Sequence, residues 1–199
     1  MRIIAASKNN GKVLELKSIL GNYGFDVVSQ EEIGIDADVC ETGKSFVENA
    51  SIKAHAIAML CDDAVIADDS GICVNALGGE PGVYSARYSG VHGDDEANNK
   101  KLLENLADKE DRSAYFECAM SLIMPDGSEI TASGRVNGRI LHEPEGNGGF
   151  GYDPLFYSDE LKKCFGTASA EEKNSVSHRG RALKGICEKL DEYFKKEEN

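Results

Sequence analysis

The sequence is poor in positive charge. It contains 22 Lys and Arg residues against 35 Asp and Glu residues, which gives a formal net charge of -13 and a pI near 4.8. A surplus of negative charge repels nucleic acid and anionic membrane surfaces, and no basic stripe along the chain offsets it. A nucleic-acid-binding module is therefore the poorest functional class, and a polyanionic ligand must bind through local cations or a metal ion.

The sequence also lacks an uninterrupted apolar segment of membrane-spanning length, and the apolar run at its start is brief. We therefore expect a soluble cytoplasmic protein without a membrane partner. The six cysteines, at positions 40, 61, 73, 118, 164 and 187, form no CxxC pair, and no His is spaced to complete a zinc site with them. Reduced and mostly buried thiols are the expected state.

The length and the hydrophobic content of the chain are sufficient for a sizeable core. With 199 residues, of which 41% are hydrophobic, residues 1–199 are expected to form one domain, with two lobes as an option. The pattern of apolar residues predicts a mixed α/β chain, in which a turn at 125–127 joins two strands into a long hairpin. Strands are predicted over 2–6, 25–28, 64–67, 72–74, 114–124 and 129–136, and helices over 11–20, 45–60, from 94 or 95 to 106, and from 177 onward.

A polar segment follows the first predicted strand and opens the first predicted helix. It is not a Walker P-loop, because the GxxxxGK[ST] spacing is missing. Amides at a helix N-terminus nevertheless favour an anion, and a lysine adds a full positive charge. The segment is a predicted phosphate site, with an ordinary Asn-Gly turn and helix cap as the alternative, and it consists of Ser7, Lys8, Asn9, Asn10, Gly11 and Lys12.

A second polar segment, Asp68-Asp69-Ser70-Gly71, follows the apolar run 65–67 and is predicted to be a turn at a strand end. Magnesium prefers hard oxygen ligands and commonly takes only one or two protein carboxylates, together with waters and substrate phosphates. Glu41 is a plausible further ligand. A turn that is acidic for purely local reasons is the alternative reading. Glu15 and Glu48, on predicted helices, are either additional ligands or solvated.

A glycine-rich segment over 145–154 permits close approach to a ligand, and aromatic and cationic residues lie in it and after it. Phe150 and Tyr152 offer rings for stacking, while Lys173, His178 and Arg179 offer donors that can read a carbonyl oxygen. Arg179 alternatively binds phosphate or pairs with an acidic residue. A structural or solvent-exposed role is the alternative for His178.

Taken in order, these pieces resemble the inosine/xanthosine triphosphate pyrophosphatase family, which hydrolyses non-standard purine nucleoside triphosphates. The resemblance runs over nearly the whole chain, and six motifs in the same order make it highly specific. The motifs are Ser7-x-Asn9-x-x-Lys12-x-x-Glu15, Glu41-Thr42-Gly43 with Phe46-Val47-Glu48-Asn49-Ala50, Ala67-Asp68-Asp69-Ser70-Gly71, Leu77-Gly78-Gly79-x-Pro81-Gly82-Val83-Tyr84-Ser85-Ala86-Arg87, Gly148-Gly149-Phe150-Gly151-Tyr152-Asp153-Pro154, and Glu172-Lys173-x-x-x-Ser177-His178-Arg179-Gly180.

The resemblance implies an elongated, two-lobed α/β subunit with a twisted mixed sheet flanked by helices, a central active-site cleft, and assembly as a homodimer. It implies Mg²⁺-dependent hydrolysis of ITP, dITP or XTP between the α and β phosphates. By position, residues 7–12 hold phosphates, Glu41 and Asp69 bind metal, and Asp69 and Lys12 are catalytic, with Asp69 as general base. The implied nucleotide contacts are Ser70, Phe150, Gly151, Tyr152, Asp153, Lys173, His178 and Arg179.

Overall fold

One open, mixed sheet runs through the computed structural model, which describes residues 1–197. Its strand order is β2-β1-β3-β4-β5-β6-β7. β1 pairs in parallel with β2 and with β3, whereas β6 pairs antiparallel with β5 and with β7. The strands are β1 (Arg2–Ala5), β2 (Asp26–Ser29), β3 (Ala64–Val74), β4 (Ser113–Ile123), β5 (Glu129–Ile140), β6 (Phe156–Ser158) and β7 (Lys163–Cys164).

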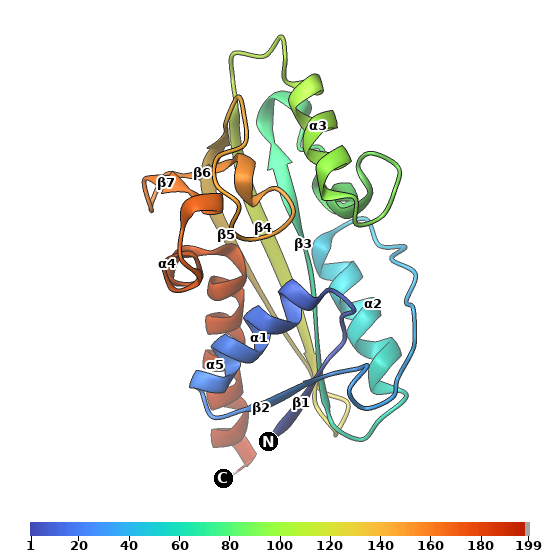
Figure 1. Ribbon diagram of the computed structural model, residues 1–199. Coiled ribbons are helices and arrows are strands. Elements are labelled where there is room, and N and C mark those ends of the chain that lie inside the picture. Colours follow the sequence, from blue (N-terminus) through green and yellow to red (C-terminus); the bar gives the residue numbers. More distant parts are fainter. Residues whose placement is uncertain (198–199) are drawn as a thin grey trace. The chain divides into compact units, whose positions relative to one another are not determined.

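Helices alternate with strands over the first half of the chain, whereas β4, β5, β6 and β7 follow one another without an α-helix between them (Figure 1). The α-helices are α1 (Asn10–Asn22), α2 (Phe46–Ala58), α3 (Asp95–Asn105), α4 (Ala170–Val176) and α5 (His178–Glu197). Over residues 1–197, none of the helices combines the length and the apolar character that crossing a bilayer requires.

Side-chain caps set the starts of the helices. Asn9 accepts a hydrogen bond from the amide of Lys12 and begins α1, and Ser45 accepts one from the amide of Glu48 and begins α2. A capping box at Ser45 is only half formed, because the Glu48 carboxylate accepts from the amide of Lys44 and not from that of Ser45. The apolar side of α2 consists of four buried residues, Phe46, Ala50, Ala54 and Ile57.

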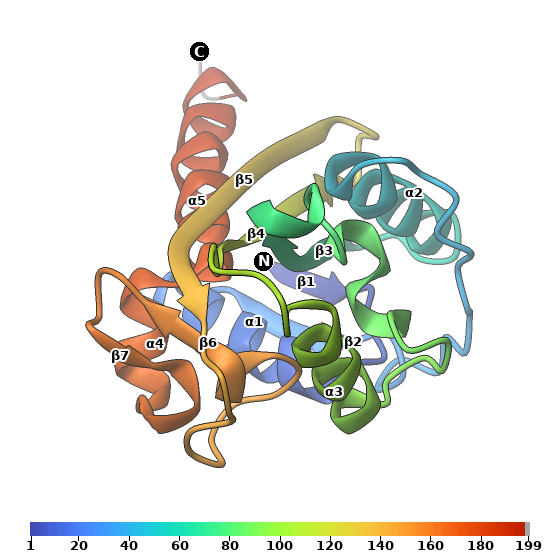
Figure 2. The same ribbon diagram turned by 90° about the horizontal axis from the view of Figure 1, so that it is seen from above.

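The chain divides into two compact units, and β3, β4 and β5 contribute residues to both. Unit 1 comprises residues 1–69 and 118–134 together with the chain from Arg179 onward, and unit 2 comprises residues 70–117 and 135–178. Unit 1 has three layers, because alternate residues of β1 and β3 face opposite ways. Ile3 and Ile66 join the core under α1 and α5, whereas Ile4 and Val65 join the core under α2 (Figures 1 and 2).

Unit 2 has a core of its own, rich in aromatic rings. The ring of Phe116 lies edge-on to that of Phe156, with centroids 4.7 Å apart, and stacks on the ring of His178 at 4.8 Å. Leu102 and Leu106 at the end of α3 are fully buried in the same cluster. This core supports the glycine-rich segment, because Tyr152 and Leu155 at its C-terminal end are part of it.

The prediction of an acidic turn at 68–71 is wrong. β3 continues through it as one strand of 11 residues, Ala64–Val74, and joins the two predicted extended pieces. Asp68 and Asp69 are almost completely buried there. Turn propensity reflects local backbone preferences, and here long-range sheet pairing and ion pairing outweigh them.

Most of the other predicted elements are confirmed to within a few residues, including the hairpin: β4 and β5 are neighbours joined by a turn in which the Gly127 amide donates to the Met124 carbonyl. The prediction missed β6, β7 and α4. β6 and β7 are too short to carry a period. α4 has a complete capping box, Ser169 with Glu172, which a closer reading of the sequence would have found.

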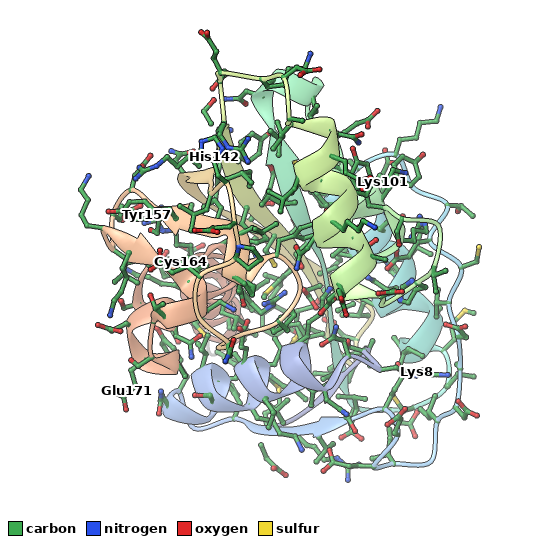
Figure 3. All side chains as sticks on the ribbon, turned by 45° about the horizontal axis from the view of Figure 1, so that its top comes forward. Lys8, Lys101, His142, Tyr157, Cys164 and Glu171 are labelled. Carbon is green, nitrogen blue, oxygen red and sulfur yellow. The ribbon has the colours of Figure 1, made fainter. Side chains whose placement is uncertain are left out.

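All six cysteines are free, and four are buried, as predicted. Cys164, labelled in Figure 3, directs its thiol at the backbone carbonyls of Asp153 and Pro154, each at 3.3 Å. Burial raises the pKa of Cys118 far above the ordinary range of a thiol. The four buried thiols, those of Cys73, Cys118, Cys164 and Cys187, therefore pack as small apolar groups rather than as nucleophiles.

The two leucines of α1 allow a direct test of the unit 1 core. Leu16 is fully buried, whereas Leu14 is 66% exposed. Leu16→Ala should lower the free energy of unfolding by about 2–5 kcal/mol, because it removes buried methyl groups and leaves a cavity. Leu14→Ala should change it by no more than about 0.5 kcal/mol. Urea denaturation measures both, and equal losses would contradict this assignment of the core face.

Candidate active site

Two adjacent carboxylates in β3 point to opposite faces of the strand. In an extended strand successive side chains alternate, so Asp68 follows Ile66 toward α1 and α5, and Asp69 follows Ala67 toward α2. A turn would have allowed both carboxylates to act on one ligand. The strand instead gives each of them a different set of partners.

Asp68 is held in a buried ion network. Its Oδ2 atom lies 3.1 Å from Lys12 Nζ and 3.1 Å from Arg179 Nη2, and Arg179 Nη1 pairs with Glu15. Burial alone would raise the pKa of Asp68, but the charges of Lys12 and Arg179 outweigh it and hold that pKa far below the ordinary value. Arg179 is only 1% exposed. Burial lowers the pKa of its guanidinium, but the negative charges of Asp68 and Glu15 outweigh that effect and raise it. Asp68 and Arg179 are therefore charged inside the protein.

Asp69 has different partners, and two of them lie on α2. Its Oδ2 atom accepts a hydrogen bond from Asn49 Nδ2 at 3.0 Å, and its Oδ1 atom lies 3.7 Å from Lys53 Nζ. The same Lys53 Nζ lies 2.5 Å from Glu41 Oε1. Burial lowers the pKa of Lys53, but the negative charges of Asp69, Asp68 and Glu41 outweigh that effect and raise it above the usual value.

Burial raises the pKa of Asp69 and so makes this carboxylate a better proton acceptor than a solvated aspartate. The cations Lys53 and Lys12 act in the opposite direction, and Glu41 adds to the rise. A buried carboxylate with a raised pKa, beside a second carboxylate and a lysine, is the arrangement found at sites of acid–base chemistry.

The carboxylates of Glu41 and Asp69 fit a divalent cation. Both approach one ammonium group, so they already converge on a single position for positive charge. Their oxygens are hard ligands, and Mg²⁺ commonly takes one or two protein carboxylates and leaves its other positions to water and phosphate. No group of three or more His, Cys, Asp and Glu side chains able to hold a metal is found among the described residues. A pair of carboxylates is a donor set that suits Mg²⁺.

The segment predicted to hold phosphates starts α1 on the exposed side of unit 1. The Asn9 amide donates to Ser7 Oγ at 3.2 Å, and Lys12 extends from the first turn to Asp68. Lys8 turns away from this group. It lies beside the chain that links β2 to α2 (Figure 3), where its Nζ atom is 2.7 Å from Asp36.

In unit 2, Asp153 organises the glycine-rich segment. Its Oδ2 atom accepts from the Phe150 amide at 2.9 Å and from Lys173 Nζ at 2.7 Å. Lys173 Nζ also lies 4.7 Å from the centre of the Phe150 ring, within the range of a cation–π contact. Gly149 has a φ of +76°, which a residue with a side chain rarely adopts. These contacts fix the ring of Phe150 next to a cationic donor.

The first turns of α3 support the same segment. Asp95 Oδ2 accepts from the Gly151 amide at 2.8 Å, and Asn99 Nδ2 donates to the Gly151 carbonyl at 3.0 Å. The Tyr152 hydroxyl donates to the Ser85 carbonyl at 2.9 Å, and the Tyr152 ring is only 5% exposed. Tyr152 therefore serves the core of unit 2, and Phe150 is the more accessible ring.

The structure brings the predicted residues together in two groups. Unit 1 gathers Lys12, Glu41, Asp69 and Arg179, and unit 2 gathers Phe150, Asp153 and Lys173, with His178 packed on Phe116. Of the other metal ligands considered, Asp68 and Glu15 pair with Arg179, and Glu48 accepts from the amide of Lys44. The nucleotide contacts predicted for both groups remain predictions.

Sequence reasoning assigned no role to Asn49, Lys53, Asp95 or Asn99. A signal was present, because Asn49 and Lys53 are four residues apart on a predicted helix and so share one side of it. Asn99 and Asp95 have the same spacing on α3. Spacing alone does not say which segment a helix faces, so the contacts of these residues could be assigned only from the fold.

Comparison with known proteins extends these observations. A family model described as the Ham1 family matches residues 3–189. A dITP/XTP pyrophosphatase of Bacillus licheniformis is 48% identical over 192 residues, which cover 96% of this chain and 98% of that protein. One of Bacillus subtilis is 46% identical over 190 residues, covering 94% and 96%. The solved structure of the Staphylococcus aureus Ham1 protein superimposes with a TM-score of 0.83 at 42% identity and covers all of both chains.

The buried ion network predicts a large energetic effect at Arg179. Arg179→Leu should lower the free energy of unfolding by about 3–5 kcal/mol, because it leaves Asp68 and Glu15 buried with less compensating charge. Lys184→Leu is the control on the same helix, since its exposed pair with Glu188 should contribute less than about 0.5 kcal/mol. Denaturant titration compares the two, and a small loss at Arg179 would mean that the network does not stabilise the fold.

Proposed function

The chain belongs to the Ham1 family, and from this membership together with the geometry of the two groups we propose that it is a nucleoside triphosphate pyrophosphatase. It hydrolyses non-standard purine nucleoside triphosphates, namely ITP, dITP and XTP, to the nucleoside monophosphate and pyrophosphate. The observation that carries the proposal is the convergence of Glu41 and Asp69 on one position for positive charge in unit 1, which also contains the lysine-bearing start of α1.

In this proposal Glu41 and Asp69 hold Mg²⁺, as their hard oxygen donors suit that ion. When bound, the metal neutralises charge on the triphosphate and polarises the phosphoryl oxygens. Lys12 and the amides at the start of α1 bind the phosphate oxygens, with Ser7 and Asn9 shaping that turn. Ser70, which follows Asp69 in β3, is proposed to contact the nucleotide as well.

Asp69 is the proposed general base. Its raised pKa favours acceptance of a proton from a water molecule, which attacks the α phosphorus in line with the departing pyrophosphate. Lys12 stabilises the negative charge that develops on the phosphate oxygens. The proton ends on the Asp69 carboxylate, and the bond between the α phosphorus and the bridging oxygen breaks.

The purine is proposed to bind in unit 2. Phe150 provides a stacking surface, which holds a base without distinguishing it and contributes about 1–3 kcal/mol by analogy with single-stranded nucleic acid. Hypoxanthine and xanthine carry a 6-keto acceptor for donors such as Lys173 and His178. Adenine presents a 6-amino donor and leaves those buried donors unpaired. Arg179 remains a predicted nucleotide contact, although its guanidinium pairs with Asp68 and Glu15.

We further propose that the protein acts in the cytoplasm as a homodimer, as the family resemblance implies. The acidic net charge fits an enzyme of the free nucleotide pool better than one that works on nucleic acid. Removal of ITP, dITP and XTP from that pool is the proposed role.

A substrate panel with and without Mg²⁺ tests the reaction, the base class and the cofactor together. ITP, dITP and XTP should release pyrophosphate rapidly with Mg²⁺, whereas ATP should be slower by up to about 10⁴-fold, because of its mismatched 6-amino group. Rejection of GTP must depend on the 2-amino group, so GTP is the most demanding competitor. Comparable turnover of ITP and GTP would overturn the selectivity, and tight nucleotide binding without turnover would indicate a regulatory protein.

Substitution of Asp69 tests its two proposed roles, as general base and as metal ligand. Asp69→Asn should lower kcat for ITP by at least about 10²-fold, because an amide neither accepts the proton nor binds the metal as a carboxylate does. Asp63→Asn is the control, since Asp63 pairs with Arg2 at the surface, and its turnover should be unchanged. Steady-state kinetics and a melting curve are compared for each variant. Near-normal turnover in a folded Asp69→Asn protein would rule out both roles of Asp69.

A further inference from the structure

We propose that Asn49 is a positioning residue, which fixes the carboxylate of Asp69 and ties it to the chain segment that carries Glu41. The inference rests on the proposed function for its consequence in catalysis. Its structural basis is independent of that function, because it comes from the contacts of one side chain in unit 1.

Asn49 makes two hydrogen bonds in opposite directions. Its Nδ2 atom donates to Asp69 Oδ2 at 3.0 Å, and its Oδ1 atom accepts from the Gly43 amide at 2.8 Å. The side chain is completely buried. One amide therefore joins the middle of β3 to the segment two residues after Glu41.

The partners of Asn49 allow only one orientation of its amide. A carboxylate only accepts hydrogen bonds and a backbone N–H only donates, so a flipped amide would face two mismatched groups. Space is equally restrictive, because a Cβ atom on Gly43 would lie 2.6 Å from Asn49 Oδ1. A glycine at position 43 lets the backbone approach the amide closely.

This contact decides which oxygen of Asp69 faces Lys53 and Glu41. Asn49 engages Oδ2, while Oδ1 is the atom nearest Lys53 Nζ, which in turn contacts Glu41. Asn49 and Lys53 are four residues apart on α2, so one rigid helix presents both groups to the same two segments. Asn49 thus orients the Asp69 carboxylate toward the position for positive charge that it shares with Glu41.

A merely structural role is the competing explanation, and the chain offers a matched control for it. Asn98 is 1% exposed and lies on α3. Its Oδ1 atom accepts from the Ser89 amide at 2.7 Å and its Nδ2 atom donates to the Ala86 carbonyl at 3.4 Å. Asn98 therefore joins a helix to a neighbouring segment as Asn49 does, but both of these partners are backbone groups rather than a carboxylate.

The experiment compares Asn49→Ala and Asn98→Ala in the full-length protein. Mn²⁺ is added to each protein without nucleotide, and its affinity is measured by electron paramagnetic resonance; kcat and KM for ITP are measured separately. Loss of groups that orient metal ligands typically costs 10- to 100-fold in affinity or activity. Asn49→Ala should lose that much in Mn²⁺ affinity and in kcat, with KM for ITP at saturating Mg²⁺ changed less than threefold. Asn98→Ala should lower the melting temperature but leave Mn²⁺ affinity and kcat near those of the wild type.

Asn49→Asp keeps the test decisive where the alanine variant does not fold. It preserves the shape of the side chain and an acceptor for the Gly43 amide, but as a carboxylate it does not donate to Asp69. Its kcat should therefore stay at least tenfold below the wild type in a folded protein. Wild-type kcat in Asn49→Asp would show that the donated hydrogen bond is dispensable and would overturn the proposal.

The outcomes separate this inference from the proposed function. If the wild-type protein releases no pyrophosphate from ITP, the proposed function fails, and the Mn²⁺ titration still tests Asn49. If the wild type is active but Asn49→Ala and Asn98→Ala behave alike, the positioning role is wrong. Absence of Mn²⁺ binding to the wild-type protein at millimolar concentrations also overturns it, because the claim is that Asn49 arranges the ligands before substrate arrives.

Discussion

The alternation of side chains along one strand, β3, is the constraint on which the unit 1 site depends. Two neighbouring carboxylates must be accommodated in the protein interior, and the strand sends them to opposite faces. Asp68 pairs with Lys12 and Arg179, whereas Asp69 contacts Asn49 and Lys53. Burying a carboxylate without such partners would cost several kcal/mol, so the helices that deliver these partners are as necessary to the fold as the apolar contacts.

The two faces consequently have different chemistry. On the Asp68 side the charges are nearly balanced and almost inaccessible, and the lowered pKa keeps Asp68 ionised, so it organises Lys12 and Arg179 and does not take up protons. On the Asp69 side, two carboxylates approach one lysine, and the raised pKa makes Asp69 the more readily protonated group. The charges on the Asp68 face are thus nearly compensated, whereas the Asp69 face retains the excess negative charge that suits the proposed Mg²⁺.

In unit 2, too, nearby donors compensate the charge of a buried carboxylate, that of Asp153. Asp153 collects a backbone amide and the Lys173 ammonium, and in doing so it places a cation against the Phe150 ring. α3 holds the neighbouring Gly151 by both its amide and its carbonyl. The glycine-rich segment is therefore an ordered platform for the proposed purine, and an ordered binding surface lowers the entropy cost of binding.

The sequence by itself determined the α/β class, most helix and strand positions and the family resemblance, and it named the predicted site residues without their partners Asn49, Lys53, Asp95 and Asn99. These features are encoded in apolar periodicity, in caps such as Ser45 and in motifs that are continuous along the chain. Only the tertiary structure decided that residues 68–71 are strand and not turn, that Arg179 serves Asp68 and Glu15, and that Asn49 joins Gly43 to Asp69. The physical reason is that ion pairs and sheet pairing join residues as many as 164 positions apart, and local propensity contains no information about such partners.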